Sequence, residues 1–282
     1  QAVGREILKA RSGMVIKIAF LIAGLYLLLI IAIALAQTRL LFPAGMATAH
    51  LQLPQGARRL DFTTSDGTRL HGVHIPASAK APPNASLLLG FGGNAWNAET
   101  LAAFLSTHVP DRDVVVFHYR GYRPSEGSPG AAALMEDGIA IHDYVRKTIA
   151  PDRVVAVGLS IGSGPAIQLA RNRDLAGTIL ITPFDSLKAL AREHYWWVPV
   201  GLLLRHQMEV AALAAKIDAP VAIIVAAEDT IVPSRRTEAL RRSIRRLIFD
   251  RTIANTGHND IYDHPELAAA LREAIALIEA EA

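Results

Sequence analysis

Short apolar segments that alternate with longer amphipathic ones place the tightest limit on what this chain can fold into. The short segments are rich in Val, Ile and Leu and do not alternate with polar residues, so they indicate strands buried on both faces. They cover residues 86–91, 114–119, 154–158, 178–181, 220–226 and 247–253. The amphipathic segments predict helices at residues 97–108, 131–147, 161–171, 234–246 and 265–279. This strand–helix order predicts an α/β fold with right-handed crossovers and a mostly parallel, doubly wound sheet.

Two segments depart from this order. Residues 59–63 and 69–75 alternate polar and apolar side chains on either side of Asp66-Gly67, which predicts an antiparallel hairpin at one edge of the sheet. Residues 185–216 replace a single crossover helix with a longer helical insertion that contains Tyr195-Trp196-Trp197. The insertion is either a lid over a substrate site or a set of helices that packs on the flank of the sheet.

A long apolar segment precedes these elements. Residues 18–36 are apolar throughout, apart from Gly24 and the hydroxyl of Tyr26. A helix of this length, rising about 1.5 Å per residue, matches the roughly 30 Å hydrocarbon core of a bilayer. We therefore expect four parts: a basic tail at 1–13, a transmembrane anchor at 14–36, a connector at 37–57 and the α/β domain at 58–282.

The charges beside the apolar segment predict its orientation. Arg5, Lys9, Arg11 and Lys17 lie on its N-terminal side, whereas only Arg39 follows it closely. Because an excess of Lys and Arg marks the cytoplasmic side of a membrane helix, we expect a single-pass protein with a cytoplasmic N-terminus. The α/β domain would then lie outside the cytoplasm, in the periplasm if the cell is bacterial.

Two other interpretations of the apolar segment stay open. Ala34-Leu35-Ala36 resembles a signal-peptidase site, and cleavage after it would release the α/β domain at Gln37. The segment could also be a buried core helix, although a soluble helix of this length is rarely apolar on all sides. We prefer the anchor because the apolar segment is longer than the 7–15 residues typical of a signal core.

A nucleophile motif follows the third strand of the series. Gly158-Leu159-Ser160-Ile161-Gly162 has the pattern G-x-S-x-G and lies where the strand at 154–158 meets the helix at 161–171. In that context the pattern predicts a tight turn that projects the Ser160 hydroxyl from the sheet edge, with glycines permitting close approach of the backbone. The alternative is an ordinary strand–helix turn.

The base and the acid that such a serine requires follow later strands. Asp229 comes after the strand at 220–226, and His258 comes after the strand at 247–253. Carboxyl ends of parallel strands meet at one edge of an open α/β sheet, so we expect Ser160 as nucleophile, His258 as general base and Asp229 as its orienting acid.

Competing acids and the oxyanion hole complete the predicted site. Glu228 and Asp263 are the weaker candidates for the acid. The oxyanion hole needs two backbone N–H donors, which we assign to Ile161 and to Asn94 in the Gly92-Gly93-Asn94 loop after the strand at 86–91. That Gly-Gly pair could instead be a simple turn.

These motifs resemble the serine aminopeptidase-like and monoacylglycerol lipase-like branch of the α/β-hydrolases, in particular its Bem-related single-anchor members. The matching stretches are FGGNAWN at 91–97, YRGY at 119–122, SEG at 125–127, GLSIG at 158–162, TPFDS at 182–186, the Asp229 and His258 loops, and RLLFP at 39–43. The resemblance implies the α/β-hydrolase fold, serine-hydrolase activity on acyl esters or thioesters, no cofactor and membrane association.

The chain departs from the pattern of this family at two positions. Gly92 stands where the family usually has a histidine that braces the oxyanion loop, and Arg123 stands where it usually has glycine.

Composition narrows the remaining possibilities. A net charge of +3 is too small to indicate nucleic-acid binding, and the absence of cysteine excludes thiolate catalysis and cysteine-ligated zinc. No phosphate-binding glycine motif or metal cluster is present in the sequence, so we expect no cofactor and no metal. The expected partners are an acyl ester or lipid substrate and the membrane. Two alternatives are a serine peptidase or aminopeptidase and a catalytically silent, membrane-tethered binding protein.

Overall fold

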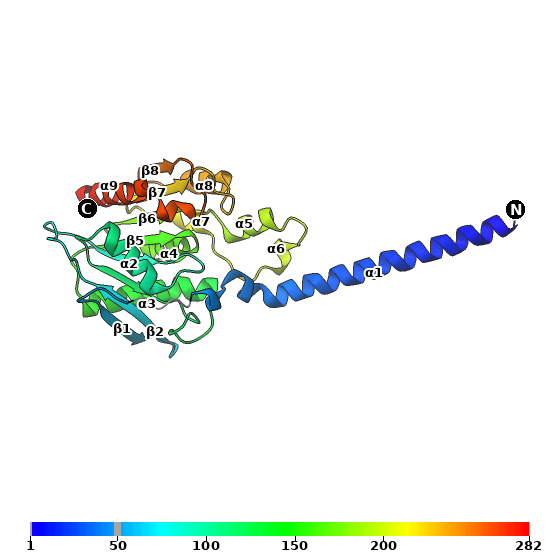
Figure 1. Ribbon diagram of the computed structural model, residues 1–282, viewed down its shortest axis with the longest axis horizontal. Coiled ribbons are helices and arrows are strands. Elements are labelled where there is room, and N and C mark those ends of the chain that lie inside the picture. Colours follow the sequence, from blue (N-terminus) through cyan, green and yellow to red (C-terminus); the bar gives the residue numbers. More distant parts are fainter. Residues whose placement is uncertain (1, 48–51, 282) are drawn as a thin grey trace.

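One mixed sheet organises the body of the protein in a computed structural model that describes residues 2–47 and 52–281, with side chains from residue 11 onward except residue 12 (Figure 1). Across the described residues the sheet has eight strands in the order β1-β2-β4-β3-β5-β6-β7-β8. Their bounds are β1 Arg58–Thr63, β2 Arg69–Ile75, β3 Leu87–Phe91, β4 Val114–Phe117, β5 Val154–Leu159, β6 Gly177–Ile181, β7 Val221–Ala226 and β8 Leu247–Ile253. The six strands from β3 to β8 run parallel, as the apolar segments predicted.

The N-terminal hairpin forms the antiparallel edge of the sheet. β1 pairs with β2 in a register that sets Asp61 opposite His71, and β2 pairs antiparallel with β4. The prediction of an antiparallel hairpin beside a mostly parallel sheet is therefore confirmed.

Helices cover both faces of the sheet, which divides the core into two layers. The bounds of the helices on the body are α2 Ala98–His108, α3 Ala131–Thr148, α4 Ser163–Asn172, α7 Val210–Ala214, α8 Ser234–Arg241 and α9 Pro265–Glu281. Alternate residues of β5 show the division: Ala156 packs with α3 and α4, whereas Val155 and Val157 pack with α2 and α9. All three are fully buried, as strands covered on both faces require.

Helix α8 ends earlier than the amphipathic pattern predicted. It stops at Arg241 because the chain must turn back to enter β8 beside β7. Ser243 closes the turn through its backbone N–H and its hydroxyl, both of which donate to the carbonyl oxygen of Leu240.

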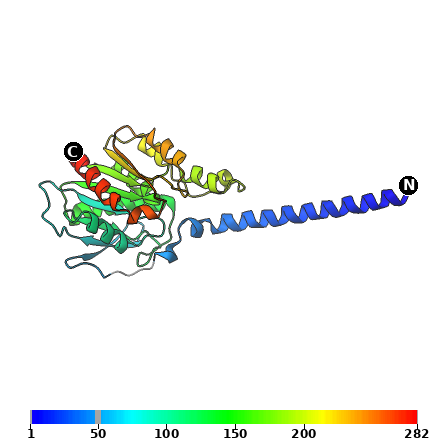
Figure 2. The same ribbon diagram turned by 45° about the horizontal axis from the view of Figure 1, so that its top comes forward.

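Helix α1 (Ala2–Leu41) projects from the body as a single rod (Figures 1 and 2). Within the described residues, one helix is long and apolar enough to cross a membrane, and it covers Gly13–Met46 with only 6% of its most apolar window buried. Phe42, just after α1, is 2% exposed and packs in the same core layer as α3.

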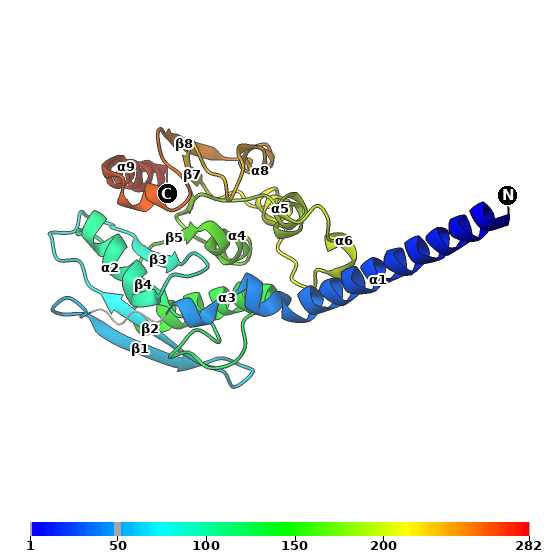
Figure 3. The same ribbon diagram turned by 45° about the vertical axis from the view of Figure 1, so that its right-hand side comes forward.

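The insertion that the sequence indicated lies beside the C-terminal part of α1. It contains α5 (Leu187–His194) and α6 (Val200–Leu203) before α7. Figure 3 shows α6 next to α1, where Val198 and Val200 form a small apolar cluster with Ile30. The insertion therefore packs on α1 and not only on the sheet.

Candidate active site

Ser160 lies at the turn between β5 and α4, with a backbone φ of +49°. This left-handed conformation is strained for a residue with a side chain and is typical of a nucleophile elbow. A Cβ on Gly158 would lie 2.5 Å from the carbonyl oxygen of Gly162, and a Cβ on Gly162 would lie 2.1 Å from that of Phe91. The two glycines are therefore required by close backbone packing, which holds Ser160 at the carboxyl end of a central strand.

The imidazole of His258 lies between Ser160 and Asp229. Its Nδ1 is 2.7 Å from Oδ2 of Asp229, and its Nε2 is 3.1 Å from the Ser160 Oγ. An ionised carboxylate only accepts hydrogen bonds, so Nδ1 carries the hydrogen and Nε2 is left to accept the Ser160 proton. The His258 and Asp229 side chains are only 9% and 7% exposed.

Backbone donors fix the orientation of Asp229. Its Oδ1 accepts hydrogen bonds from the N–H groups of Ile231 at 2.9 Å and Val232 at 2.7 Å, which turns Oδ2 toward His258. The two competing acids, Glu228 and Asp263, are exposed.

The Asp229 and His258 loops are also tied to each other. The N–H of Glu228 donates to the carbonyl oxygen of Thr256 at 2.9 Å. This contact fixes the spacing of two loops that follow neighbouring strands, β7 and β8. The sequence carries no signal for Thr256, because this hydrogen bond uses its backbone carbonyl, which any residue could supply.

The two residues assigned to the oxyanion hole line the same cleft as Ser160. Asn94 and Ile161 lie there together with His258 and Trp96. Ile161 directly follows the nucleophile, and Asn94 belongs to the loop after β3. Four of the five predicted site residues therefore line one cleft, and the fifth, Asp229, is hydrogen-bonded to His258 beside it.

Two tyrosine hydroxyls hold the loop that contains Asn94. Tyr119 donates to the carbonyl oxygen of Gly92 at 2.8 Å, and Tyr122 donates to that of Asn94 at 3.0 Å. Burial raises the pKa of both tyrosines above the ordinary value of 10.0, so both stay protonated donors. The sequence matched the YRGY stretch to a family but gave neither tyrosine a role.

Arg123, the second departure from the pattern of the family that the sequence resembles, stands at a position where the structure does not require glycine. Arg123, in place of the usual glycine, is exposed to solvent. By contrast, Gly121 has a φ of +78°, and a Cβ there would lie 2.5 Å from Cδ of Pro129. The turn needs glycine at position 121 and not at 123.

The cleft itself is mainly apolar. Its walls include Phe184 from the loop after β6, Leu187 and Leu190 from α5, and Leu40 and Leu41 from the end of α1. A serine nucleophile with an adjacent base, in a cleft of this kind, can transfer an acyl group from an apolar substrate to water. Among the side chains that the structure describes, no three histidine, aspartate or glutamate residues converge as metal ligands would.

Comparisons with known proteins give relatives of two kinds. No protein-family model matches the chain. It is 32% identical over 238 residues to an uncharacterised protein of Mycobacterium tuberculosis, with 82% of each chain covered. It is 29% identical over 138 residues to the lysophosphatidylserine lipase ABHD12 of Danio rerio, covering 43% of this chain and 36% of the lipase.

A solved structure extends the comparison to the fold. The esterase Pf2001 of Pyrococcus furiosus superimposes with a TM-score of 0.65 at 16% identity, over 82% of this chain and 96% of the esterase. At this identity the similarity concerns the fold alone.

Proposed function

We propose that this chain, which has the α/β-hydrolase fold, is a membrane-anchored serine hydrolase that cleaves carboxylic esters or thioesters. The observation that carries the proposal is the position of His258, hydrogen-bonded to both Ser160 and Asp229. An ordinary surface histidine is solvated, whereas His258 is buried between a strained serine and an oriented carboxylate, as a catalytic base would be.

In the proposed reaction, Ser160 Oγ attacks the substrate carbonyl carbon while His258 Nε2 takes the hydroxyl proton. Backbone N–H groups of Ile161 and Asn94 stabilise the negative charge that develops on the carbonyl oxygen. The tetrahedral intermediate collapses to an acyl-Ser160, and the leaving alcohol or thiol takes the proton from His258. Water then attacks the acyl group, gives its proton to His258, and releases the acid as the proton returns to Ser160.

The cleft favours an acyl ester over a peptide. None of the described residues that line it is an aspartate or glutamate, so nothing in the lining would pair with the ammonium group of an aminopeptidase substrate. Its apolar walls suit an acyl chain, and a relative named as a lysophosphatidylserine lipase supports a lipid-like substrate.

Contacts between α1 and the body support an uncleaved anchor. The Tyr26 hydroxyl donates to the carbonyl oxygen of Trp197, and Ile30 is 6% exposed against the insertion. Cleavage after Ala36 would remove both residues and expose the apolar surface that they cover. The basic residues before the apolar segment keep the N-terminus in the cytoplasm and the hydrolase domain outside it.

Labelling with a fluorophosphonate tests the proposed nucleophile. The wild-type protein should be labelled on Ser160, and Ser160→Ala should abolish labelling while the fold is retained. Ser163→Ala is the matched control, because Ser163 is a buried serine one turn away. Loss of labelling in the Ser163 variant alone, or absence of labelling and ester hydrolysis in the wild type, would support the catalytically silent alternative or another nucleophile.

A further inference from the structure

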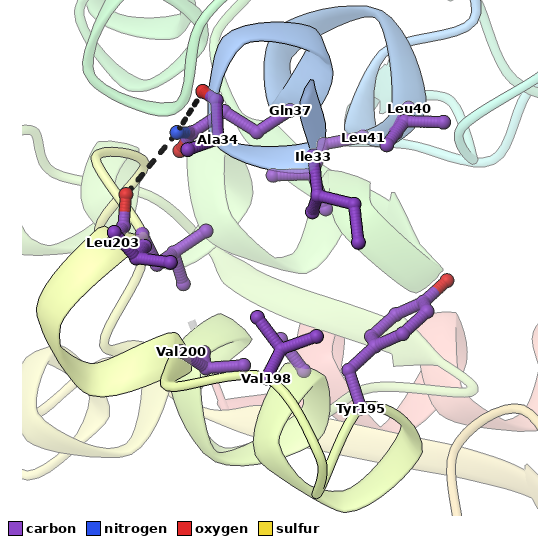
Figure 4. A pocket seen from close by; sticks show the side chains of 11 residues that line it. Ile33, Ala34, Gln37, Leu40, Leu41, Tyr195, Val198, Val200 and Leu203 are labelled. Atoms are coloured by element: carbon purple, nitrogen blue, oxygen red, sulfur yellow. Dashed lines mark hydrogen bonds between the residues drawn. The ribbon is translucent and has the colours of Figure 1, made fainter. Parts of the chain in front are cut away.

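A second pocket lies between α1 and the insertion, beside the cleft at Ser160 (Figure 4 shows the second pocket). The two spaces share four lining residues, Leu40, Leu41, Ala191 and Tyr195. In Figure 4 side chains of α1, such as Ile33, face those of the insertion across the pocket. A ligand that fills both spaces would therefore touch α1 and Ser160 at once.

The second pocket presents a mainly apolar surface to its contents. Gln37 is the one amide among its lining residues in the described part of the chain, and its polar atoms are already bonded. Its Nε2 donates to the carbonyl oxygens of Ala34 at 2.7 Å and Leu203 at 3.1 Å, and its Oε1 accepts from the N–H of Arg205 at 2.8 Å. Gln37 thus bridges α1 and the insertion instead of offering a polar group to a ligand.

The walls of this pocket are joined at both ends. Besides the Gln37 bridge, Thr38 Oγ1 lies 2.9 Å from Nε2 of His206. Farther along α1, the Tyr26 hydroxyl donates to the Trp197 carbonyl oxygen at 2.7 Å. These hydrogen bonds hold α1 and the insertion in place on either side of the pocket, so the space between them is part of the folded structure.

The Tyr26 contact also fixes the depth of the insertion, if α1 crosses the membrane as proposed above. The helix from Tyr26 to Ala36 is about 15 Å long, roughly half the hydrocarbon thickness of a bilayer. The α5–α6 connector therefore lies within the outer half of the bilayer. The exposed side chains suit that place, since Trp196 of the connector is 82% exposed and Leu202 of α6 is 88% exposed.

The charges of the insertion fit the same arrangement. Arg192 and Arg205 are exposed near this surface, and long basic side chains can extend from an apolar surface to lipid phosphates at the interface.

We propose that the pocket between α1 and the α5–α6 segment is the acyl-chain site of the enzyme, filled directly from the outer leaflet by the chain of a membrane lipid. This inference rests on the proposed hydrolase function and adds the substrate class and its route. The ester carbonyl reaches Ser160 while the chain stays in apolar surroundings, so the lipid tail never crosses water. The anchor is then part of the substrate site as well as a tether.

Filling the pocket tests the acyl-chain site. Ala34→Trp places a bulky side chain in the pocket from α1, and Ala32→Trp is the matched control on an exposed face of the same helix. The full-length protein is assayed in detergent micelles on p-nitrophenyl esters from acetate to palmitate. If two methylenes of the acyl chain lose their contact with the pocket, kcat/KM should fall by about tenfold.

We expect Ala34→Trp to lower the ratio of kcat/KM on palmitate to that on acetate by at least about tenfold. Ala32→Trp should keep the wild-type ratio. An unchanged ratio in Ala34→Trp would overturn the acyl-chain site but not the hydrolase function. Absence of acetate hydrolysis in the wild type would instead contradict the proposed hydrolase function, so the two results can be told apart.

Photo-crosslinking of a substrate to an inactive variant tests the acyl-chain site by binding alone, without catalysis. Ser160→Ala in phosphatidylcholine vesicles is irradiated with a diazirine-labelled palmitate p-nitrophenyl ester, and crosslinks are mapped by mass spectrometry. Crosslinks at residues 33–41 and 198–204 that disappear in the Ser160→Ala/Ala34→Trp variant support the site. Crosslinks confined to other surfaces contradict it.

Depth is tested by fluorescence quenching with phosphatidylcholine brominated on its acyl chains. We expect quenching that is largely lost in Trp196→Phe/Trp197→Phe, because both tryptophans lie in the connector, and kept in Trp96→Phe. Quenching that is the same in all three proteins would overturn entry from the leaflet, because Trp196 would then lie outside the hydrocarbon layer.

Discussion

The hydroxyl of Tyr119 lies 2.8 Å from the carbonyl oxygen of Gly92, and it donates a hydrogen bond to the loop that contains Asn94. The family that the sequence resembles usually has a histidine at the position of Gly92. This chain braces the same loop from a neighbouring strand end instead, with Tyr122 bonded to the next part of the loop.

Removing this brace should reduce turnover more than binding. Tyr119→Phe leaves the carbonyl oxygen of Gly92 without its partner and frees the loop to shift, and small shifts of catalytic groups cost up to about 100-fold in rate. We expect kcat to fall by about 10- to 100-fold on acetate esters with little change in KM. Tyr144→Phe is the control, since Tyr144 stacks on Phe62 away from the cleft. Equal losses in both variants would indicate a general effect on stability.

The acid of the triad is tested by an isosteric change. Asp229→Asn keeps the shape of the side chain but cannot hold the His258 imidazole in the required tautomer, and the same change in a serine protease costs about 10⁴-fold in kcat. Glu228→Gln should retain near wild-type activity because Glu228 is exposed. A larger loss from Glu228→Gln than from Asp229→Asn would mean that the acid has been assigned to the wrong residue.

Acid should weaken the contact between α1 and the insertion. Burial, with a smaller effect of Arg205, lowers the pKa of His206 below its ordinary value of 6.5. The unfolded chain therefore binds the proton more readily than the folded one, so this contribution to stability is present above pH 6.5 and is lost as the pH falls through the lowered pKa.

The comparison of His206→Gln with the wild type isolates this effect. Between pH 7.5 and pH 5 the thermal midpoint of the wild type should fall further than that of the variant. His142, whose pKa burial also lowers, contributes to the fall in both proteins and cancels in the difference. Parallel midpoints over the whole range would show that His206 is not protonated on unfolding.

The membrane assignment predicts how the protein fractionates. The full-length protein should resist alkaline carbonate and require detergent, because residues 18–36 are apolar. A protease added to the outside of intact cells should reach the hydrolase domain. Recovery of a mature protein that begins at Gln37 would instead establish a cleaved signal.

Truncation separates the anchor from the catalytic body. A chain that begins at Gln37 should fold, because the sheet and both core layers follow that residue. It should keep activity on acetate esters but lose activity on long-chain esters, since Ile33 and Ala34 line the second pocket. Full long-chain activity in this shortened protein would show that α1 supplies no wall of the substrate site.

Local patterns in the sequence determined much of this protein. Continuous apolar runs such as 154–158 predict a strand buried on both faces, because a strand with one wet face would need alternating polar residues. The glycines beside Ser160 predict the strained turn for a similar local reason: only glycine allows the backbone to pack so closely there. The position of Ser160, Asp229 and His258 just after three of the predicted parallel strands indicated that their side chains share one edge of the sheet.

Only the tertiary structure decided the contacts between distant segments. Tyr119 reaches Gly92 across two strand ends, and Tyr26 meets Trp197 at a sequence separation of 171 residues. The acceptor in each of these hydrogen bonds is a backbone carbonyl, and every residue has one. The sequence therefore gives no sign of which carbonyl the fold brings next to each tyrosine. Periodicity and spacing report which face of its own element a side chain occupies, whereas the pocket between α1 and the insertion exists only after the two have packed together.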